Sequence, residues 1–379
     1  MTIRTLVLSG GGGRGAFHAG VFKYLCQADK PGVDAAHAGP WKPDIVVGTS
    51  IGAVNGAAVA QGIGPDALEA FWLSLREGDI QGLPPGMGPL ARRAANIVLR
   101  RSIGVPLQRV PEDQALSASA QESWPPLPLL PAWLSSRLIG RWSNLLDTGP
   151  LYRTLITRLQ LDEDAINASE TALLISATDV QTGEGMVFSN RPVTRRTGEP
   201  NPHVRTPITL RRIIASCSIP IVYPWTRDTD GAVYWDGAVV ANTPLGPAFD
   251  VARDRPLAEP MEVVIVLMTP WWETGEEGPA RRSQLPQDFG EAMTWTLDWA
   301  LLASFRVDLK LARSYNRLAA LAQAVGQEPA YRQCLDIIVA PREFLPVARI
   351  IDYDEPASRE LIRMGYEAAE RAFRAYFSA

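Results

Sequence analysis

A serine in a glycine-flanked pentad is the first residue of this sequence that could do covalent chemistry. The pentad Gly48–Gly52 reads Gly-Thr-Ser-Ile-Gly, follows an Ile- and Val-rich run, and precedes a stretch of small residues. A strand, a GxSxG pentad and a helix in this order are typical of a nucleophile elbow. The glycines allow the strained turn and a close approach of substrate. The alternative interpretation is an ordinary helix start, with Thr49 or Ser50 as its N-cap.

A glycine-rich loop near the N-terminus could hold negative charge. Residues 10–15 read Gly-Gly-Gly-Gly-Arg-Gly and lie between a predicted strand, Ile3–Leu8, and a predicted helix, Ala16–Cys26. Backbone N–H groups at a helix N-terminus bind phosphates or a catalytic oxyanion. No acidic residue closes a second strand about 20 residues further on, as dinucleotide-binding folds require. No Lys-Ser or Lys-Thr pair follows the glycines, as a P-loop requires. The loop therefore favours an oxyanion.

Asp236 is the candidate base. It begins the segment Asp236-Gly237-Ala238, directly after a predicted strand, Ala232–Trp235. A serine hydroxyl needs a base to become a good nucleophile. A carboxylate serves if it touches the hydroxyl and its surroundings are dry enough to raise its pKa. The small residues Gly237 and Ala238 leave room for this approach. The alternative is a turn aspartate that closes the strand.

These three segments, in this order, resemble those of the patatin-like phospholipases. Further features agree with the resemblance: Ala177–Gly183, Ala215–Pro220, and Asn242 with Pro244 two residues on. The resemblance covers about residues 3–60 and 147–270. One departure is Ser9, which precedes the glycines where relatives often have Asp.

The resemblance implies hydrolysis of acyl esters by a Ser-Asp dyad without histidine, metal or cofactor. Ser50 is then the nucleophile and Asp236 the base. The backbone N–H groups of Gly11 and Gly12 form the oxyanion hole, with Gly13 as a further contributor. The other motif residues are Gly10, Arg14, Gly15, Gly48, Gly52, Gly237 and Ala238. Arg14 would steady the loop; the alternative is a surface residue at a helix start.

The remaining candidates for polar chemistry are few. The sequence has only three histidines, which argues against a multi-histidine metal site. His18 follows the glycine loop and invites a Ser-His assignment, but a helical histidine there more often packs or faces solvent. The other candidates have mainly structural interpretations: His37 and His203 as loop residues, Asp179 as a loop-backbone acceptor, Asn55 as a packing or capping residue, and Trp271 and Trp272 as cover for the sheet or lining of an acyl site.

Alternating strand and helix patterns predict an α/β three-layer sandwich with a mainly parallel central sheet. We expect one domain over residues 1–379, with an insertion at 81–146 and a C-terminal helical region at about 286–379. Further predicted strands are 44–47, 172–180, 186–189, 262–268 and 335–340; further predicted helices are 53–60, 91–99, 148–159, 209–215, 287–324 (one helix or two) and one starting at Pro356.

The insertion has its own composition. Residues 80–146 hold seven arginines and three acidic residues, a local charge of +4 in a chain of −4, together with three tryptophans. This combination fits a peripheral membrane contact or a lid. The alternative, favoured because surface arginines are common, is an insertion that packs its apolar side chains onto the domain.

Composition narrows the function classes. The chain of 379 residues is 46% hydrophobic and carries a net charge of −4, which gives no electrostatic case for nucleic acid. Three scattered cysteines indicate reduced thiols. No secretory pattern and no apolar run of about 18 residues is present, so we expect the cytoplasm.

Three hypotheses follow. The leading one is a serine esterase of the phospholipase A or lysophospholipase type that acts on phospholipids or related lipids, with a soluble-ester carboxylesterase as its alternative. The second is a lipid-binding or scaffolding protein with little turnover. The third is a nucleotide-binding enzyme that uses the glycine loop.

Overall fold

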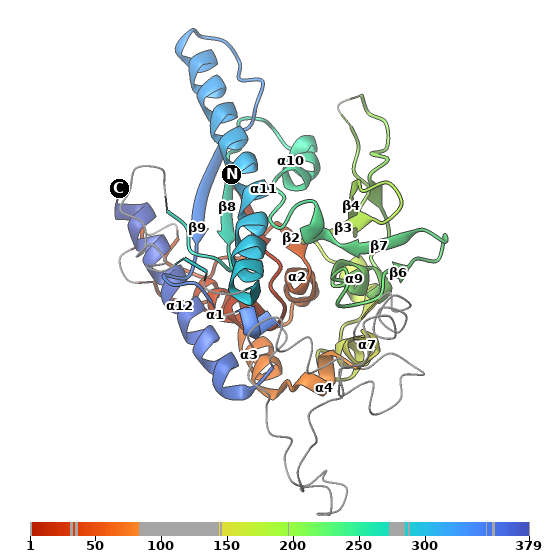
Figure 1. Cartoon of the computed structure of the whole chain (residues 1–379). Helices are drawn as coiled ribbons and strands as arrows, with labels where there is room; N and C mark the ends of the chain where they lie inside the picture. Colours follow the sequence, from red (N-terminus) through yellow and green to blue (C-terminus); the bar gives the residue numbers. More distant parts are fainter. Residues whose placement is uncertain are drawn as a thin grey trace, which may run out of the picture.

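The computed structural model describes residues 2–30, 33–34, 37–82, 144, 146–195, 197–272, 285–286, 289–345, 347–350 and 353–378. Its centre is a nine-stranded sheet (Figure 1). The strands are β1 (Ile3–Leu8), β2 (Ile45–Thr49), β3 (Ala172–Asp179), β4 (Gly185–Ser189), β5 (Val204–Arg205), β6 (Thr226–Arg227), β7 (Val233–Asp236), β8 (Met261–Val266) and β9 (Cys334–Val339). The longer helices are α1 (Ala16–Leu25), α2 (Ile51–Gln61), α3 (Pro65–Ser74), α7 (Gly149–Thr157), α11 (Phe289–Ala324) and α12 (Glu355–Ser378). Shorter ones are α4 (Glu77–Ile80), α8 (Glu163–Asn167), α9 (Leu210–Ser216) and α10 (Gly246–Val251), with 3₁₀ turns η1 (Gly12–Gly15), η4 (Gly237–Val239), η5 (Ala252–Asp254) and η6 (Val347–Ile350).

The middle of the sheet is parallel. Strands β3, β2, β1, β8 and β9 lie side by side in this order and run in the same direction. Their continuous apolar sequences fit strands that are covered on both faces. Strand β4 is antiparallel to β3, and the short β5 lies beyond it.

One strand enters the sheet from the opposite direction, at the carboxyl end of β2. Strand β2 ends with Thr49 beside Ser176 of β3. The next residue of β3, Ala177, pairs with Asp236 of the antiparallel β7. Strand β7 therefore continues the sheet position that β2 leaves, and the two strand ends meet there.

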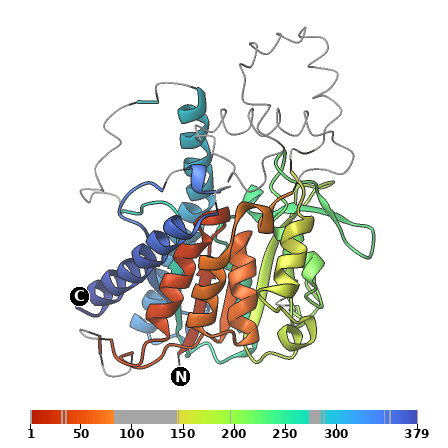
Figure 2. The ribbon, with the colours of Figure 1, turned by 90° about the horizontal axis from the view of Figure 1, so that it is seen from below.

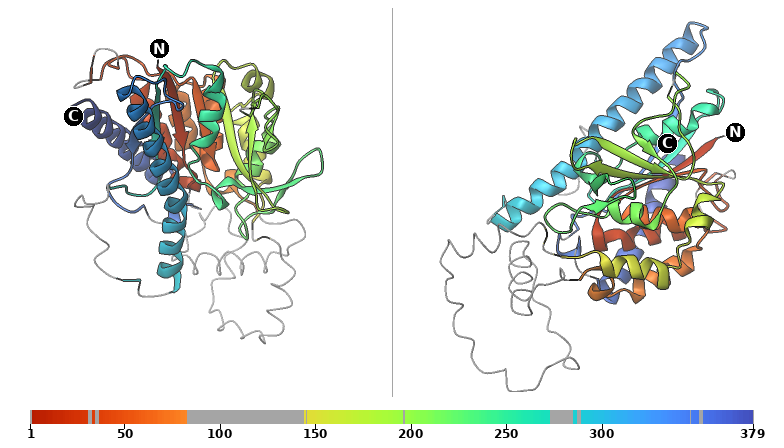
Figure 3. Two further views of the ribbon diagram at one scale, coloured as in Figure 1. Left: turned by 90° about the horizontal axis from the view of Figure 1, so that it is seen from above. Right: turned by 90° about the vertical axis from the view of Figure 1, so that its right-hand side faces the viewer.

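Helices cover both faces of this sheet, which confirms the predicted three-layer α/β sandwich (Figures 2 and 3). On one face, Leu6 and Leu8 of β1 pack in a cluster with α1, α2, α3, α7, α9 and α12. On the other face, Ile3 and Val7 pack in a second cluster with α10 and α11. This alternation along β1 is the period-two pattern of a strand buried on both sides.

Helices α1 and α12 pack with their backbones in close approach. A Cβ atom on Gly20 would lie 1.9 Å from the carbonyl oxygen of Ile362, and one on Gly365 would lie 2.0 Å from that of Phe17. Each helix thus supplies one glycine where the other helix's backbone passes. The C-terminal helix is in this way fixed onto the helix that follows the glycine loop.

The predicted strands are all present, and residues 289–324 form one helix, not two. The pattern did not indicate α3, α8 or α10. The predicted helix 91–99 and nearly all of the insertion 81–146 lie outside the described residues. Among the residues that the structure describes, no helix is long and apolar enough to cross a membrane.

Candidate active site

Ser50 lies on a strained turn between β2 and α2. Its backbone angles are φ 55° and ψ −126°, which non-glycine residues rarely adopt, and only 4% of its surface is exposed. The flanking glycines are needed for space: a Cβ on Gly48 would lie 2.4 Å from the carbonyl oxygen of Gly52, and a Cβ on Gly52 would lie 2.2 Å from that of Leu8. Although Ser50 is the N-cap residue by position, its side chain makes no capping hydrogen bond. The turn has the geometry of a nucleophile elbow.

A second serine holds this turn. The backbone N–H of Ser50 donates to the hydroxyl oxygen of Ser216 at 2.8 Å. That hydroxyl in turn donates to the carbonyl oxygen of Ser176 at 2.6 Å. Ser216, the last residue of α9, therefore links the elbow to strand β3. All three residues are buried.

Asp236 meets Ser50 from the end of β7. Its carboxylate accepts the backbone N–H of Ala238 at 2.8 Å, and the Ser50 hydroxyl acts on its pKa as a second hydrogen-bond donor. Burial raises the pKa of Asp236 from 3.8 to about 7, although the two hydrogen bonds oppose part of this shift. A base whose pKa lies near the working pH is well matched to proton transfer. The close approach depends on Gly237, because a Cβ there would lie 2.5 Å from the carbonyl oxygen of Ser176.

The glycine loop lies against the same serine. A Cβ on Gly10 would lie 3.0 Å from the Cβ of Ser50. The N–H of Gly10 donates to the side-chain oxygen of Asn242 at 2.8 Å, which fixes the start of the loop. Gly12 has a φ of +57° and begins η1, which leads into α1. Gly11, Gly12 and Gly13 follow Gly10 directly and lead to the N-terminus of α1, where anions are favoured.

Arg14 is buried, which makes the surface interpretation of this residue wrong. Its side chain is 0% exposed and donates to the carbonyl oxygen of Leu345 at 3.0 Å. It also forms an ion pair with Asp298 of α11, with 3.5 Å between Nη1 and Oδ1. A buried charge requires such partners because desolvation is costly.

His18 is part of the scaffold behind the loop. Burial lowers its pKa to about 3, so the ring is neutral near pH 7. Its Nδ1 accepts from the amide of Asn55 at 3.1 Å. The same amide also donates to the carbonyl oxygen of Gly15, while its oxygen accepts from the indole of Trp72, both at 3.0 Å. Asn55 therefore ties α1, α2 and α3 together, in keeping with its packing interpretation.

The other two histidines lie apart from Ser50. His37, for which the sequence showed no partner pattern, lies between the carboxylates of Asp34 and Glu262, each at 2.7 Å. His203 is partly exposed, with Glu184 at 3.8 Å.

The remaining candidates have structural contacts. Asp179 accepts backbone N–H groups of Gln181 and Thr182 at 2.8 and 3.0 Å, as a loop residue does. The ring of Trp271 packs edge-on against Phe305 of α11 with centroids 4.9 Å apart, and Trp272 against Trp299, also on α11, at 6.4 Å. Both tryptophans thus pack on α11.

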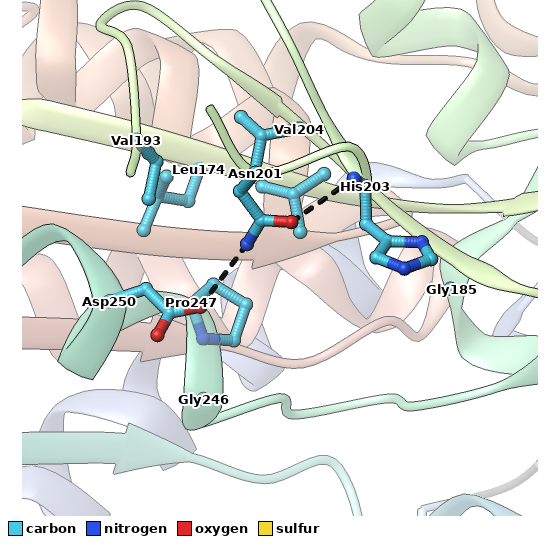
Figure 4. Close-up of a pocket in the computed structure, with 10 residues that line it drawn as sticks. Leu174, Gly185, Val193, Asn201, His203, Val204, Gly246, Pro247 and Asp250 are labelled. Atoms are coloured by element: carbon cyan, nitrogen blue, oxygen red, sulfur yellow. Dashed lines mark hydrogen bonds between the residues drawn. The ribbon is translucent and has the colours of Figure 1, made fainter. Parts of the chain in front are cut away.

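A cavity of about 280 Å³ lies elsewhere on the sheet (Figure 4). Strands β3 to β5 and helix α10 surround it. Asn201 lies between His203 and Asp250 in its wall, and Leu174 and Val187 contribute to its apolar lining. Neither Ser50, Asp236 nor the glycine loop lines this cavity.

The described residues give little support to a reactive cysteine or to a metal-binding site. The three cysteines are free, and burial raises the pKa of the Cys217 thiol, which keeps it protonated. Within the described residues, no group of three or more His, Cys, Asp or Glu side chains could hold a metal ion.

Sequence patterns missed the supporting residues of this site. Ser216 and Asn242 lie in segments that are part of the family resemblance, but a serine and an asparagine at these positions did not by themselves predict a role in the site. Asp298 and Leu345 had no signal, because they reach Arg14 only through tertiary packing.

Comparison with known proteins gave the following. The family model described as patatin-like phospholipase matches residues 6–249. Among solved structures, VipD from Legionella pneumophila matches with a TM-score of 0.40 and 11% identity, over 99% of this chain and 67% of that one. ExoU, in the heterodimeric ExoU–SpcU complex of the type III secretion system of Pseudomonas aeruginosa, matches with a TM-score of 0.32 and 12% identity, over 100% of this chain and 52% of the other.

A search of curated proteins found no match. The family model spans well over half of the chain. The chain therefore belongs to the patatin-like phospholipase family, a family of lipid-hydrolysing enzymes.

Proposed function

We propose that this protein hydrolyses carboxylic esters of phospholipids or related lipids, as a phospholipase A or lysophospholipase does, with Ser50 as nucleophile and Asp236 as base. The observation that carries the proposal is the placement of Ser50, just after the end of β2, beside the buried carboxyl group of Asp236, whose pKa is raised to about 7. Such a group is ionised often enough near neutral pH to accept a proton, and basic enough to hold it.

The reaction follows from this pair. Ser50 Oγ attacks the ester carbonyl carbon while its proton passes to Asp236. The resulting oxyanion accepts hydrogen bonds from the N–H groups of Gly11 and Gly12, with Gly13 as a further donor. When the tetrahedral intermediate collapses, Asp236 returns the proton to the leaving alcohol. Water then attacks the acyl-enzyme with Asp236 again as base, and the fatty acid leaves while Ser50 recovers its proton.

We also propose the wider setting of this reaction. Residues 1–379 form one catalytic domain, with 81–146 inserted into it and a C-terminal region at about 286–379. The substrate is a lipid met in peripheral contact with a membrane on the cytoplasmic side. The dyad mechanism needs neither metal nor cofactor, since Asp236 supplies the base and the loop supplies the charge stabilisation.

The test combines active-site labelling with a lipid panel. A fluorophosphonate should label the wild type and Ser189→Ala, a control at another buried serine, but not Ser50→Ala. Fatty acid release should follow the same pattern on phospholipid vesicles. Wild-type protein that is folded and binds vesicles but neither labels nor releases fatty acid would indicate a lipid-binding scaffold. Turnover of soluble esters alone would indicate a carboxylesterase.

The histidine-free dyad has its own control. His18→Ala should keep most of the turnover per folded molecule, because the imidazole ring of His18 is hydrogen-bonded to Asn55 and not to Ser50. A His18→Ala protein that is folded but as inactive as Ser50→Ala would contradict the dyad.

A further inference from the structure

The arginine of the glycine loop is held by residues far along the chain. Its guanidinium lies between the carboxylate of Asp298 on α11 and the carbonyl oxygen of Leu345. The side chains of Arg14 and Asp298 are 0% and 2% exposed. Both contacts therefore lie in a region of low dielectric, where charge interactions are strong and geometry matters most.

The neighbouring glycine is enclosed by the same part of the chain. A Cβ on Gly12 would lie 2.2 Å from the carbonyl oxygen of Ile350, a residue of η6. The backbone of η6 thus passes directly over the loop. Asp298, Leu345 and Ile350 all lie beyond residues 6–249, which the family model matches. The contacts that enclose the glycine loop on this side come from outside the matched region.

The position of Arg14 limits the movement of the oxyanion donors. Its backbone lies next to Gly13, and its N–H donates to the carbonyl oxygen of Gly11 at 3.2 Å. An oxyanion hole works only when its donors lie about 2.7–3.1 Å from the developing negative charge. A displacement of about 1 Å can cost a factor of about 100 in rate. A guanidinium held by an ion pair at Nη1 and a hydrogen bond at Nη2 therefore restrains the loop that carries these donors.

We propose that Asp298 is a positioning residue for the oxyanion hole, acting through Arg14, so that helix α11 completes the active site. The inference rests on the proposed function, because it gives the glycine loop its role in ester hydrolysis. Asp298 itself touches no reacting atom. Its carboxylate fixes the orientation of Arg14, which in turn keeps the N–H groups of Gly11 and Gly12 directed at the oxyanion.

The test compares two ion pairs on the same helix. Asp298→Asn removes the charge that faces Arg14. Asp336→Asn is the control, because it breaks the pair between Arg313 of α11 and Asp336 of β9, at 2.7 Å, which does not involve the loop. We expect kcat of Asp298→Asn to fall about 10- to 100-fold with KM changed less than about 3-fold. The control should keep the wild-type kcat.

A second readout does not depend on catalysis. Backbone amide hydrogen exchange of residues 10–15 should be faster in Asp298→Asn than in wild type or Asp336→Asn, because the loop is less firmly held. Unchanged exchange in the loop would overturn the proposal even if wild-type protein hydrolysed no lipid. Hydrogen exchange thus tests the positioning role of Asp298, whereas lipid hydrolysis by the wild type tests the proposed function.

A double variant separates positioning from folding. Replacing both charges by apolar side chains of similar size, Arg14→Met with Asp298→Leu, avoids a buried unpaired charge and often preserves stability. A double variant with wild-type Tm, reduced kcat and faster loop exchange supports the role of Asp298. One with wild-type Tm and wild-type kcat overturns it. In Asp298→Asn and in the double variant, the pH midpoint of kcat/KM should stay at the wild-type value, because Asp236 is unchanged.

Discussion

Asp236 lies beside Ser50 because two strands meet end to end in one sheet position. Thr49 of β2 pairs with Ser176 of β3, and the next residue of β3, Ala177, pairs with Asp236 of β7. The register of the backbone therefore brings both side chains to one point. The proposed dyad is thus positioned by strand ends, which suits a reaction that needs near-attack geometry.

Asp236→Asn should abolish turnover and stabilise the fold at high pH. The pKa of Asp236 is raised in the folded state, from 3.8 to about 7, so its stabilising contribution is complete below about pH 4 and is lost as pH rises through 7. Asparagine does not ionise and still accepts the N–H of Ala238. We expect the unfolding free energy of Asp236→Asn to exceed that of the wild type by an amount on the order of 1–4 kcal/mol at pH 8. Denaturant unfolding at pH 4 and pH 8 measures this; an equal gap at both would contradict it.

The pH dependence of kcat/KM should show an ascending limb with a midpoint near pH 7. In the proposed mechanism Asp236 accepts a proton only when ionised, and burial raises its pKa to about 7. His18 should not contribute, because burial lowers its pKa to about 3. Steady-state rates between pH 5 and 9 on a non-ionising ester test this. A midpoint near 4 would indicate a solvated carboxylate.

Gly12→Ala should inactivate the enzyme. The new Cβ would meet the carbonyl oxygen of Ile350 at 2.2 Å, and the φ of +57° adds strain. We expect kcat to fall about 10²- to 10³-fold, as on the loss of an oxyanion donor. Gly62→Ala is the matched control, because φ is +89° there but nothing lies within 4 Å. It should cost about 1 kcal/mol of stability and leave kcat unchanged.

Ser216→Ala should impair the elbow more than the fold. The variant leaves the N–H of Ser50 without its hydroxyl acceptor, which costs about 1–3 kcal/mol and loosens the nucleophile. We expect kcat to fall at least about 10-fold. Ser218→Ala, in the same turn, removes a buried hydroxyl that donates to the carbonyl oxygen of Ile214. It should lower Tm with little change in kcat, and equal kcat losses in the two variants would argue against a specific role for Ser216.

Ile221→Gly should not destabilise the protein. Ile221 has a φ of +72° and is 74% exposed, so it combines backbone strain with little burial. Glycine relieves about 1–2 kcal/mol of strain and loses part of this to chain entropy. We expect the unfolding free energy to stay level or rise by up to about 1 kcal/mol. Ile156→Gly on α7, 44% exposed, should instead lower it by about 1 kcal/mol, because glycine weakens a helix.

Local sequence sufficed for much of the fold. The apolar runs at 3–8, 172–180 and 262–268 predicted strands that the structure contains, because strands buried on both faces need continuous apolar sequence. The periodic apolar residues from Ile362 to Phe377 likewise predicted a helix starting at Pro356, which is α12 (Glu355–Ser378) in the structure. Short elements such as α8 and α10 gave no comparable pattern, since a single turn or two of helix has too few residues to show a period.

Only the residues of the sequence motifs could be predicted as parts of the site. The types and order of Ser50, Asp236 and the glycine loop pointed to one reaction, and the structure brings these residues together. The burial of Arg14 was not predictable, because its partners Asp298 and Leu345 are distant in sequence and of unremarkable type. The raised pKa of Asp236 likewise depends on tertiary burial.

The reciprocal glycine contacts of α1 and α12 have a consequence for synthesis of the protein. Helix α1 begins at the glycine loop, and the backbone of α12 passes against it at Gly20 and Gly365. The ribosome synthesises α1 well before α12, which follows it far along the chain. Helix α1, which follows the glycine loop, can therefore acquire this packing only after residues 355–378 have been synthesised.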